Sequence, residues 1–463
     1  MKRSVLLALA ALLLAGCTVG PNYRRPTVDT PADFRGALAP ATTESLGDLR
    51  WWQIFPDETL QSLIRAALDA NYDVRIAAAR ILEARAQVTI TRSFQFPELA
   101  ASGSAPYSRI EGQVPSSAVQ VRELWRPAGG LDLSFEVDLW GRFRRASEAA
   151  RADLLASQDA RAFVITTLVS DVGSAYFLLR ALDQELDISR LTLNAREGSL
   201  QLVQRREAGG VAALIDVRQA ETLVAGAAQT IPDIQRQIEQ TENAISILLG
   251  RSPAPVPRGR PLGEQIGAQG VPAGVPSSLL ERRPDVRQAE EQLAAATARI
   301  GVAKSDFFPR VFLTGAAGVG GITINGQSFG PQGLFAIGPS FTLPIFNSGR
   351  VAAGVDAAQA NAEAAMLQYQ QVVLGAFRDV SDSLVEYAKR RESRVQQEIL
   401  TIAARDTVRL ANIRYRGGVT TYLEVLDSDR QLFDAELSLV RNQRDELLAV
   451  VRLYKALGGG WQE

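Results

Sequence analysis

The chain has 463 residues and a nearly balanced charge, with 50 Lys and Arg against 51 Asp and Glu, and it contains no histidine and a single cysteine. No disulfide can therefore form within one chain, and the usual zinc, haem and thiol chemistries lack their ligands. We do not expect an enzyme, and the mixture of basic and acidic residues throughout the chain gives no sign of a nucleic-acid partner.

The N-terminal residues are typical of a secretory signal. A basic start is followed by an apolar run from Val5 to Ala15, which is too short to span a bilayer. The run ends in Leu-Ala-Gly-Cys, which is similar to the cleavage box of bacterial lipoproteins, in which the cysteine, here Cys17, is lipidated and becomes the N-terminus. The alternative is an ordinary signal peptide followed by a free, unmodified cysteine. The residue directly after Cys17 is Thr18 and not an aspartate. By resemblance to known lipoproteins, this favours retention in the outer membrane.

Four short sequence marks recur in the same order about 210 residues later, which indicates one duplicated unit rather than a solenoid array. The pairs are Asp73-Val74-Arg75 with Asp285-Val286-Arg287, Phe96-Pro97 with Phe308-Pro309, Gly141-Arg142 with Gly349-Arg350, and Gly209-Gly210-Val211 with Gly417-Gly418-Val419.

These marks predict a domain order along the chain. We expect a signal peptide at 1–16, a lipid-anchored segment at 17–56, a first repeat at 57–250, an extended linker at 251–276, a second repeat at 277–458 and a tail at 459–463. The linker is rich in proline and glycine, so no core of its own is expected there.

Alternating residues predict strands in each repeat. From Leu131 to Leu139, apolar residues alternate strictly with Asp, Ser and Glu, which is the pattern of a strand with one apolar and one polar face. Weaker alternation from Leu99 to Tyr107 indicates a partner strand. The second repeat has the same plan, with a glycine-rich turn region expected after Val319. We expect four strands, at about 98–108, 129–140, 310–321 and 335–346, each long enough to cross a bilayer when tilted.

The segments between the strands predict helices. The two longest, 142–208 and 350–416, contain no proline, and each would be about 100 Å long. Shorter helices at 72–95 and 214–249, and their copies at 285–307 and 420–457, would match that length when stacked in pairs. A short amphipathic helix is expected at about 57–70.

Four strands cannot close a barrel, and in lipid an open sheet edge leaves unpaired backbone groups that cost several kcal/mol each. The chain is therefore expected to oligomerise. Two copies would give about eight strands with a filled interior, whereas three would give about twelve and an open lumen. The polar face, with Asp132, Glu136 and Asp138, would line water, and the helices would project into the periplasm.

Several motifs together resemble TolC-like outer-membrane efflux proteins of the lipoprotein subgroup. They are the lipoprotein box, Trp51-Trp52 with Phe55 and Asp57, Arg283-Pro284-Asp285-Val286-Arg287, Phe308-Pro309, and Tyr415-x-x-Gly418 followed by Tyr422-Leu423-Glu424-Val425-Leu426-Asp427. The resemblance implies an α+β membrane protein in the cell outer membrane. It would be a homotrimer whose twelve-stranded transmembrane β-barrel continues into a long periplasmic α-helical barrel.

The same resemblance implies a function and partners. The chain would be the exit duct of a tripartite efflux pump for drugs or other small molecules. Its partners would be a periplasmic adaptor protein and an inner-membrane transporter, usually of the resistance-nodulation-division type. Acylated Cys17 would hold it to outer-membrane lipid. No cofactor is implied.

In this family the periplasmic tip closes the duct, and rings of apolar and acidic residues narrow the opening. By this resemblance, Leu423 would contribute to the apolar ring and Asp427 to the acidic ring. Arg430 would be a candidate charged partner of Asp427. Their spacing of four and three residues places them on one helix face. Tyr415 and Arg416 resemble the family's inter-helix latch. The alternative is that Asp427 and Arg430 form a solvated surface pair.

The predicted helix tips carry paired glycines, Gly209 with Gly210 and Gly417 with Gly418. The two repeats differ nearby, because Gln219 stands where the second repeat has Asp427. The sequence therefore predicts an acidic ring of one carboxylate per chain.

Two alternatives to drug efflux remain at this point. The same fold could serve metal-ion efflux or type I secretion, although the lack of histidine weakens a dedicated metal-binding lumen. A periplasmic scaffold lipoprotein without a channel is the other, and the alternating strands argue against it.

Overall fold

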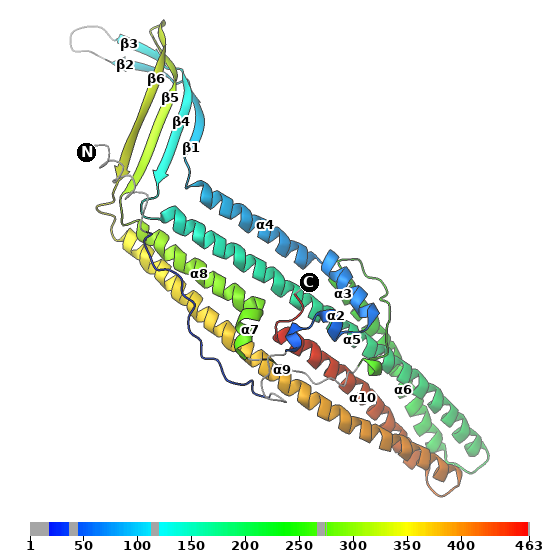
Figure 1. Ribbon diagram of the computed structural model, residues 1–463. Coiled ribbons are helices and arrows are strands. Elements are labelled where there is room, and N and C mark those ends of the chain that lie inside the picture. Colours follow the sequence, from blue (N-terminus) through cyan, green and yellow to red (C-terminus); the bar gives the residue numbers. More distant parts are fainter. Residues whose placement is uncertain (1–17, 37–44, 113–119, 266–273, 275, 462–463) are drawn as a thin grey trace. The chain divides into compact units, whose positions relative to one another are not determined.

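The computed structural model describes residues 18–36, 45–112, 120–265, 274 and 276–461 (Figure 1). Cys17 and the predicted signal peptide lie outside these residues. The chain divides into two compact units. The first comprises residues up to Thr27, Arg80–Ser157 and Gln288–Tyr369, and the second comprises Val28–Ala79, Gln158–Arg287 and Gln370–Glu463. Each unit is described by itself.

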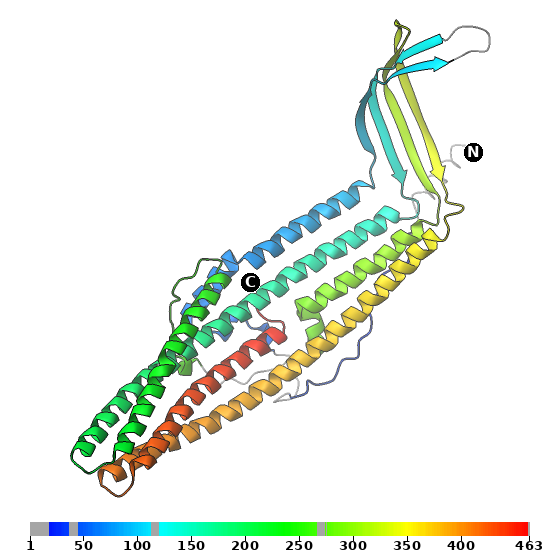
Figure 2. The same cartoon turned by 180° about the vertical axis from the view of Figure 1, so that it is seen from behind.

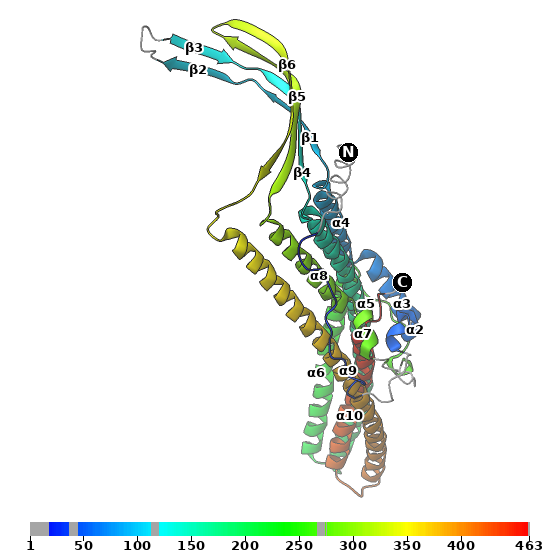
Figure 3. The ribbon, with the colours of Figure 1, turned by 60° about the vertical axis from the view of Figure 1, so that its left-hand side comes forward.

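The first unit contains an antiparallel sheet, in which the described residues form six strands. They are β1 (Glu98–Ser104), β2 (Tyr107–Gly112), β3 (Gln120–Trp125), β4 (Ala128–Val137), β5 (Arg310–Ile324) and β6 (Gln327–Thr342). The long strands follow the order β1-β4-β5-β6, and the β2–β3 hairpin joins the end of β5 through Leu124 and Trp125. Figure 3 shows this hairpin beside the turn between β5 and β6.

The strand ends differ from those predicted, and prolines account for the first difference. Pro106 interrupts the first expected strand and Pro127 interrupts the region opposite it, since proline has no N–H to donate to a ladder. The two breaks face each other, because the Arg126 N–H donates to the carbonyl of Pro106 at 3.0 Å. One predicted hairpin therefore becomes two consecutive strand pairs.

The second hairpin is longer than predicted. The glycine-rich stretch after Val319, expected to be a turn region, is strand, and the actual turn is Asn325-Gly326. Both residues have positive φ, 48° and 80°, as a two-residue turn of the mirror-image type requires. Because β6 ends at Thr342, the strand expected at 335–346 is shifted toward the turn.

The register gives the sheet two distinct faces. Residues directly opposite in neighbouring strands point to the same face. Phe135 pairs with Leu313 and Val137 with Val311, so one face is apolar, whereas Ser134 pairs with Thr314 on the other face. The predicted separation of apolar and polar side chains is therefore present in the structure.

Two very long helices, α5 (Arg142–Ala208) and α9 (Arg350–Arg416), have the bounds that the sequence predicted, and both contribute residues to the two units. In the first unit, α5 packs against α8 (Pro284–Ser305) through small residues, including Ala149, Ala152 and Ala295. The same unit contains most of α4 (Tyr72–Ser93). Small side chains let helix backbones approach closely.

One helix in the described part of the chain, α5, is long and apolar enough to cross a membrane by composition. However, 56% of its most apolar window is buried within the structure. Packing of a core helix therefore accounts for its apolar residues equally well.

The second unit holds shorter helices. They are α2 (Trp51–Ile54), α3 (Glu58–Ala70), α6 (Leu214–Leu248), α7 (Pro276–Arg282) and α10 (Tyr422–Ala456), with the short turns η1 (Leu46–Asp48) and η2 (Leu262–Glu264). Asp57 caps α3 by accepting from the backbone of Thr59 at 2.9 Å. Its other carboxylate oxygen accepts from the hydroxyl of Tyr176 at 2.8 Å and from the N–H of Arg260 at 3.0 Å. Asp57, singled out in the sequence, thus joins three segments of the unit.

Residues 251–265 of the linker predicted at 251–276 pack on the helices instead of being free, whereas 266–273 and 275 lie outside the described residues. Val256 and Leu262 are buried. Arg258 forms ion pairs with Asp183 of α5, at 3.0 Å, and with Glu242 of α6. Burial and ion pairing hold this segment against the second unit, which its proline and glycine content did not predict.

Candidate functional site at the helix tips

The second unit ends in two helical hairpins, in which short turns join α5 to α6 and α9 to α10 (Figure 2). Both turns have the same geometry. The N–H of Val211 donates to the carbonyl of Arg206 at 2.9 Å, and that of Val419 to Arg414 at 3.0 Å. These bonds close Schellman motifs, which need a left-handed residue after the helix.

Of the four glycines predicted at the tips, two supply the left-handed residue. Gly210 has φ 74° and Gly418 has φ 73°. A side chain at either position would meet no neighbouring atom within 4 Å, so the constraint lies in the backbone and not in space. Gly209 and Gly417 precede them with ordinary φ.

A small apolar core joins the two hairpins just behind the turns. It contains residues from all four helices. The members are Val203, Val217, Ala220, Ala411, Tyr415, Tyr422, Val425 and Leu426. The ring centres of Tyr415 and Tyr422 in this core lie 5.2 Å apart. The tips of the two repeats are therefore packed together within one chain.

Tyr415 and Arg416, which the resemblance assigned to one latch, have different environments in the structure. Tyr415 is 6% exposed, and the guanidinium of Arg206 lies over its ring at 4.5 Å. Arg206 also donates to the carbonyl of Tyr415 at 3.4 Å. Burial raises the pKa of Tyr415, and its hydroxyl has no hydrogen-bond partner in the part of the chain that the structure describes. Tyr415 thus links α9 to α5, whereas Arg416 is exposed.

Leu423, Asp427 and Arg430 lie together on the exposed face of α10, as their spacing predicted. Leu423 is 61% exposed. Asp427 and Arg430 form an ion pair of 3.1 Å, with side chains 50% and 66% exposed. The amide of Gln431 donates to the second oxygen of Asp427 at 2.6 Å. In a single chain this pair is a solvated one, worth less than about 1 kcal/mol.

A buried arginine, Arg196, holds α10 in place, and the sequence did not predict this role. Arg196 of α5 donates to Asp429 at 2.7 Å and to the carbonyl of Leu223 at 3.0 Å, and its guanidinium lies 4.9 Å from the ring centre of Phe433. Asp429 and Phe433 are four residues apart and share a face of α10. This four-residue spacing is the one sequence signal that could have indicated a binding partner for that face of α10.

The motif from Arg283 to Arg287 forms a second cluster, within the same unit. Arg283 is buried and binds Asp285 at 2.6 Å, Asp379 at 3.3 Å and the carbonyl of Ala456 at 3.1 Å. Burial acts to lower the pKa of Arg283, but the hydrogen bonds and charges of the two aspartates raise it above its ordinary value.

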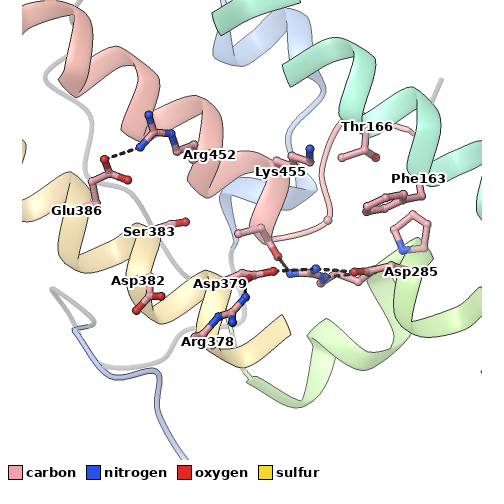
Figure 4. A pocket seen from close by; sticks show the side chains of 14 residues that line it. Phe163, Thr166, Asp285, Arg378, Asp379, Asp382, Ser383, Glu386, Arg452 and Lys455 are labelled. Carbon is pink, nitrogen blue, oxygen red and sulfur yellow. Dashed lines mark hydrogen bonds and ion pairs between the residues drawn. The ribbon is translucent and has the colours of Figure 1, made fainter. Parts of the chain in front are cut away.

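A hollow of about 660 Å³ adjoins this cluster, and Figure 4 shows side chains of both charges around it. Glu386 and Arg452 pair across α9 and α10 at 2.5 Å. Within the described residues, no group of three or more acidic, histidine or cysteine side chains could hold a metal ion. The ion pairs and hydrogen bonds of the cluster therefore hold neighbouring helices together.

Comparison with known proteins gives consistent matches along the chain. The sequence profile of the family described as outer membrane efflux protein matches residues 63–251 and 275–459. The chain is similar to the toluene efflux pump outer membrane protein TtgC of Pseudomonas putida, with 35% identity over 472 residues that cover 100% of this chain and 97% of the relative. It is also similar to the cation efflux system protein CusC of Escherichia coli, with 32% identity over 457 residues and 98% of each chain covered.

Among solved structures, the open state of the MtrE outer membrane channel of Neisseria gonorrhoeae is similar to this chain with a TM-score of 0.84. The two share 32% sequence identity, and the match covers 96% of this chain and 99% of the other.

Proposed function

Because this chain belongs to the outer membrane efflux protein family, we propose that it forms the exit duct of a tripartite pump that passes drugs, organic solvents or other small amphiphiles out of the cell. The family match and the similarity to TtgC and MtrE confirm the predicted resemblance, the outer-membrane location and the channel function. The cargo, the partners and the gate are the parts that we propose.

The single observation that carries the proposal is the sheet of the first unit. One face is apolar and the other polar, and its outer long strands β1 and β6 each pair with one strand in the described part of the chain. In lipid an unpaired strand edge is unfavourable, so the edges must be closed by other copies. Three copies supply about twelve long strands, enough for a water-filled lumen.

The duct works with two protein partners and a lipid. We propose that a periplasmic adaptor and an inner-membrane transporter of the resistance-nodulation-division type deliver cargo to it. Acylated Cys17 holds the chain to the outer membrane. The names of TtgC and CusC describe outer-membrane and system components of efflux pumps, which supports this assembly.

The periplasmic gate lies at the helix tips in this proposal. Three copies bring three exposed Leu423 and three Asp427 side chains around one axis, and like charges that approach one another repel. Arg430 offsets part of that charge, since it pairs with Asp427. Tyr415 and Arg416 form the latch, in which buried Tyr415 ties α9 to Arg206 of α5 within a chain.

Ion conductance tests the proposal. The purified full-length protein, reconstituted in a planar bilayer, is expected to give discrete single-channel currents and to run as a trimer that resists dissociation on a gel. A lipid-anchored scaffold would show neither property. Trimers that are folded but never conduct, even after loosening of the tips, would contradict the exit-duct proposal.

A metal cation is the second candidate cargo, and the similarity to CusC favours it. A passive duct needs no resident metal site, so the chain itself does not choose between cargoes. The two are separated by growth of cells that lack this gene in the presence of toluene or of a panel of metal cations. Sensitivity to toluene alone supports solvent efflux, and sensitivity to a metal cation alone supports cation efflux.

A further inference from the structure

An aromatic hollow lies in the first unit, where α4 leads into β1 and where β4 leads into α5. It has a volume of about 690 Å³, and its lining includes five aromatic rings and three charged side chains: Phe94, Phe96, Phe135, Phe143 and Phe312, with Glu98, Glu136 and Arg142. We propose that this hollow is a transit site for small aromatic molecules, which deepens the proposed efflux function and rests on it.

The aromatic rings of the hollow are held in place by contacts within the unit. Phe94 and Phe143 stack with ring centres 5.7 Å apart and an angle of 24°. Gln95, between Phe94 and Phe96, donates to the carbonyl of Phe143 at 3.2 Å and to the hydroxyl of Ser147 at 2.7 Å. These bonds fix the end of α4 against the first turns of α5, so the rings are preorganised.

Phe312 is an exception to the pattern of its strand. It pairs with Glu136, so it lies on the polar face of the sheet, while Val311 and Leu313 lie on the apolar face. Its neighbours on the polar face of β5 are small or polar, including Thr314 and Ala316. A large aromatic side chain on the face proposed to line the lumen is not needed to meet lipid. It is available to a molecule inside the duct.

The rings and charges of the hollow favour an aromatic ligand. Arg142 binds Glu136 through two hydrogen bonds, at 3.1 Å and 2.5 Å, so these two charges neutralise each other. The same guanidinium lies 4.2 Å from the ring centre of Phe143. The carboxylate of Glu98 also lines the hollow, so a positively charged substituent on the ligand is compatible with it. Ring faces and edges offer stacking and edge-to-face contacts to another ring, so a benzene-like molecule fits this chemistry better than an aliphatic chain.

Photolabelling of the intact trimer tests the site. The probe is 3-trifluoromethyl-3-phenyldiazirine, an uncharged aromatic molecule that inserts into nearby residues when illuminated, and labelled peptides are identified by mass spectrometry. In wild-type trimers in lipid nanodiscs, we expect labelling of the peptides that contain Phe94 and Phe143, and we expect excess toluene to suppress it. Labelling of residues that meet lipid will not saturate.

Variants of Phe312 separate a ring effect from a folding effect. Phe312→Leu keeps an apolar side chain without the ring and is expected to reduce the toluene-sensitive labelling several-fold, whereas Phe312→Tyr keeps it. Phe341→Ala removes a ring that is 79% exposed on the apolar face of the same sheet and serves as the matched control. It should leave the saturable labelling unchanged.

The outcomes distinguish this proposal from the exit-duct proposal. Trimers that conduct in a bilayer but show no toluene-sensitive labelling at Phe94 and Phe143 would overturn the transit site and leave the duct intact. That result is also expected if a second copy fills the hollow. Equal saturable labelling in Phe312→Leu and wild type would likewise overturn it. Saturable labelling without conductance would count against the duct and would leave the hollow as a binding site with no transit role, because labelling does not depend on ion flow.

Discussion

Arg196 of α5 and Asp429 of α10 form an ion pair of 2.7 Å in which the arginine side chain is 6% exposed. We predict that Arg196→Met, which keeps much of the apolar stem but removes the charge, leaves Asp429 partly buried without its partner. Breaking such a pair costs about 3 kcal/mol. The urea midpoint of the purified trimer, followed by near-ultraviolet circular dichroism, should fall accordingly.

The control for this change is another arginine ion pair of similar length. Arg218 and Glu221 on α6 pair at 2.8 Å with side chains 68% and 40% exposed, and water screens the attraction in an exposed pair, so the pair contributes little to stability. Arg218→Met should therefore leave the midpoint almost unchanged. Combining Arg196→Met with Asp429→Leu should recover part of the loss, because no buried charge is then left unpaired. Equal effects of Arg196→Met and Arg218→Met would contradict the assigned role.

The turn glycines give a second prediction. Gly418 has φ 73°, which costs a residue with a side chain about 1–2 kcal/mol. Gly417 has ordinary φ, and a Cβ there would lie 3.4 Å from the carbonyl oxygen of Ile413, an ordinary contact. Gly418→Ala should therefore open the tip more often than Gly417→Ala.

Limited trypsin digestion measures this opening, since Arg414 and Arg416 lie at the end of α9. When cleavage is slow, its rate follows the population of the open form. A cost of 1–2 kcal/mol corresponds to about a fivefold to thirtyfold faster cleavage in Gly418→Ala. Gly417→Ala should resemble wild type, and equal cleavage of the two variants would refute the backbone argument.

The helices were predictable from the sequence because their limits carry strong local signals. Gly141 and Gly349 precede the two long helices and Gly209 and Gly417 follow them, with no proline in between. The strand ends were less predictable. The glycine-rich sequence after Val319 predicts a turn region, whereas Asn325-Gly326 is the pair that makes the turn.

At the candidate gate, too, local sequence patterns were predictive, whereas contacts between distant residues were not. Helical spacing grouped Leu423, Asp427 and Arg430, and the structure has them on one exposed face. The partner of Asp429 could not be found in this way, because Arg196 lies 233 residues earlier in the chain. A pairing over that distance depends on how four helices pack, which no periodicity encodes.

Ionisation of Tyr422 gives a prediction on pH. Burial, and then the charge of Asp429, raise the pKa of Tyr422 to about 12 from an ordinary 10.0. A raised pKa means that the folded tip favours the neutral phenol. The stability that the neutral phenol contributes is complete below pH 10 and is lost as the pH rises through about 12.

The near-ultraviolet absorbance of tyrosinate measures this titration. We expect the difference between wild type and Tyr422→Phe to show one group with a midpoint near 12. Tyr107→Phe is the control, because Tyr107 is 61% exposed. If the group lost in Tyr422→Phe titrates near 10.0, Tyr422 is not buried as described.

The predicted lipid anchor is tested at Cys17. Because the chain has one cysteine, Cys17→Ser removes the only thiol that could be acylated. Cells fed radiolabelled palmitate should label the wild-type protein and not the variant. Palmitate incorporation that persists in Cys17→Ser would show that the anchor lies elsewhere or that labelling is not specific.

The gate proposal predicts a gain of conductance when the charged residues of the tip are removed. Asp427 and Arg430 are exposed and contribute less than about 1 kcal/mol to the fold of one chain, so Asp427→Ala with Arg430→Ala should assemble normally. If these residues narrow the opening in the trimer, the double variant should have a higher single-channel conductance. A matched exposed pair far from the turn, Lys389 with Glu392, should change nothing when replaced by alanine.

Salt provides a second readout for the same gate. Charges that face one another across an opening are screened over about 10 Å at 0.1 M salt. Wild-type conductance corrected for bulk conductivity should therefore depend on salt concentration more steeply than that of the double variant. If the double variant forms stable trimers with wild-type conductance and wild-type salt dependence, Asp427 and Arg430 are a solvated pair and the constriction lies elsewhere along the duct.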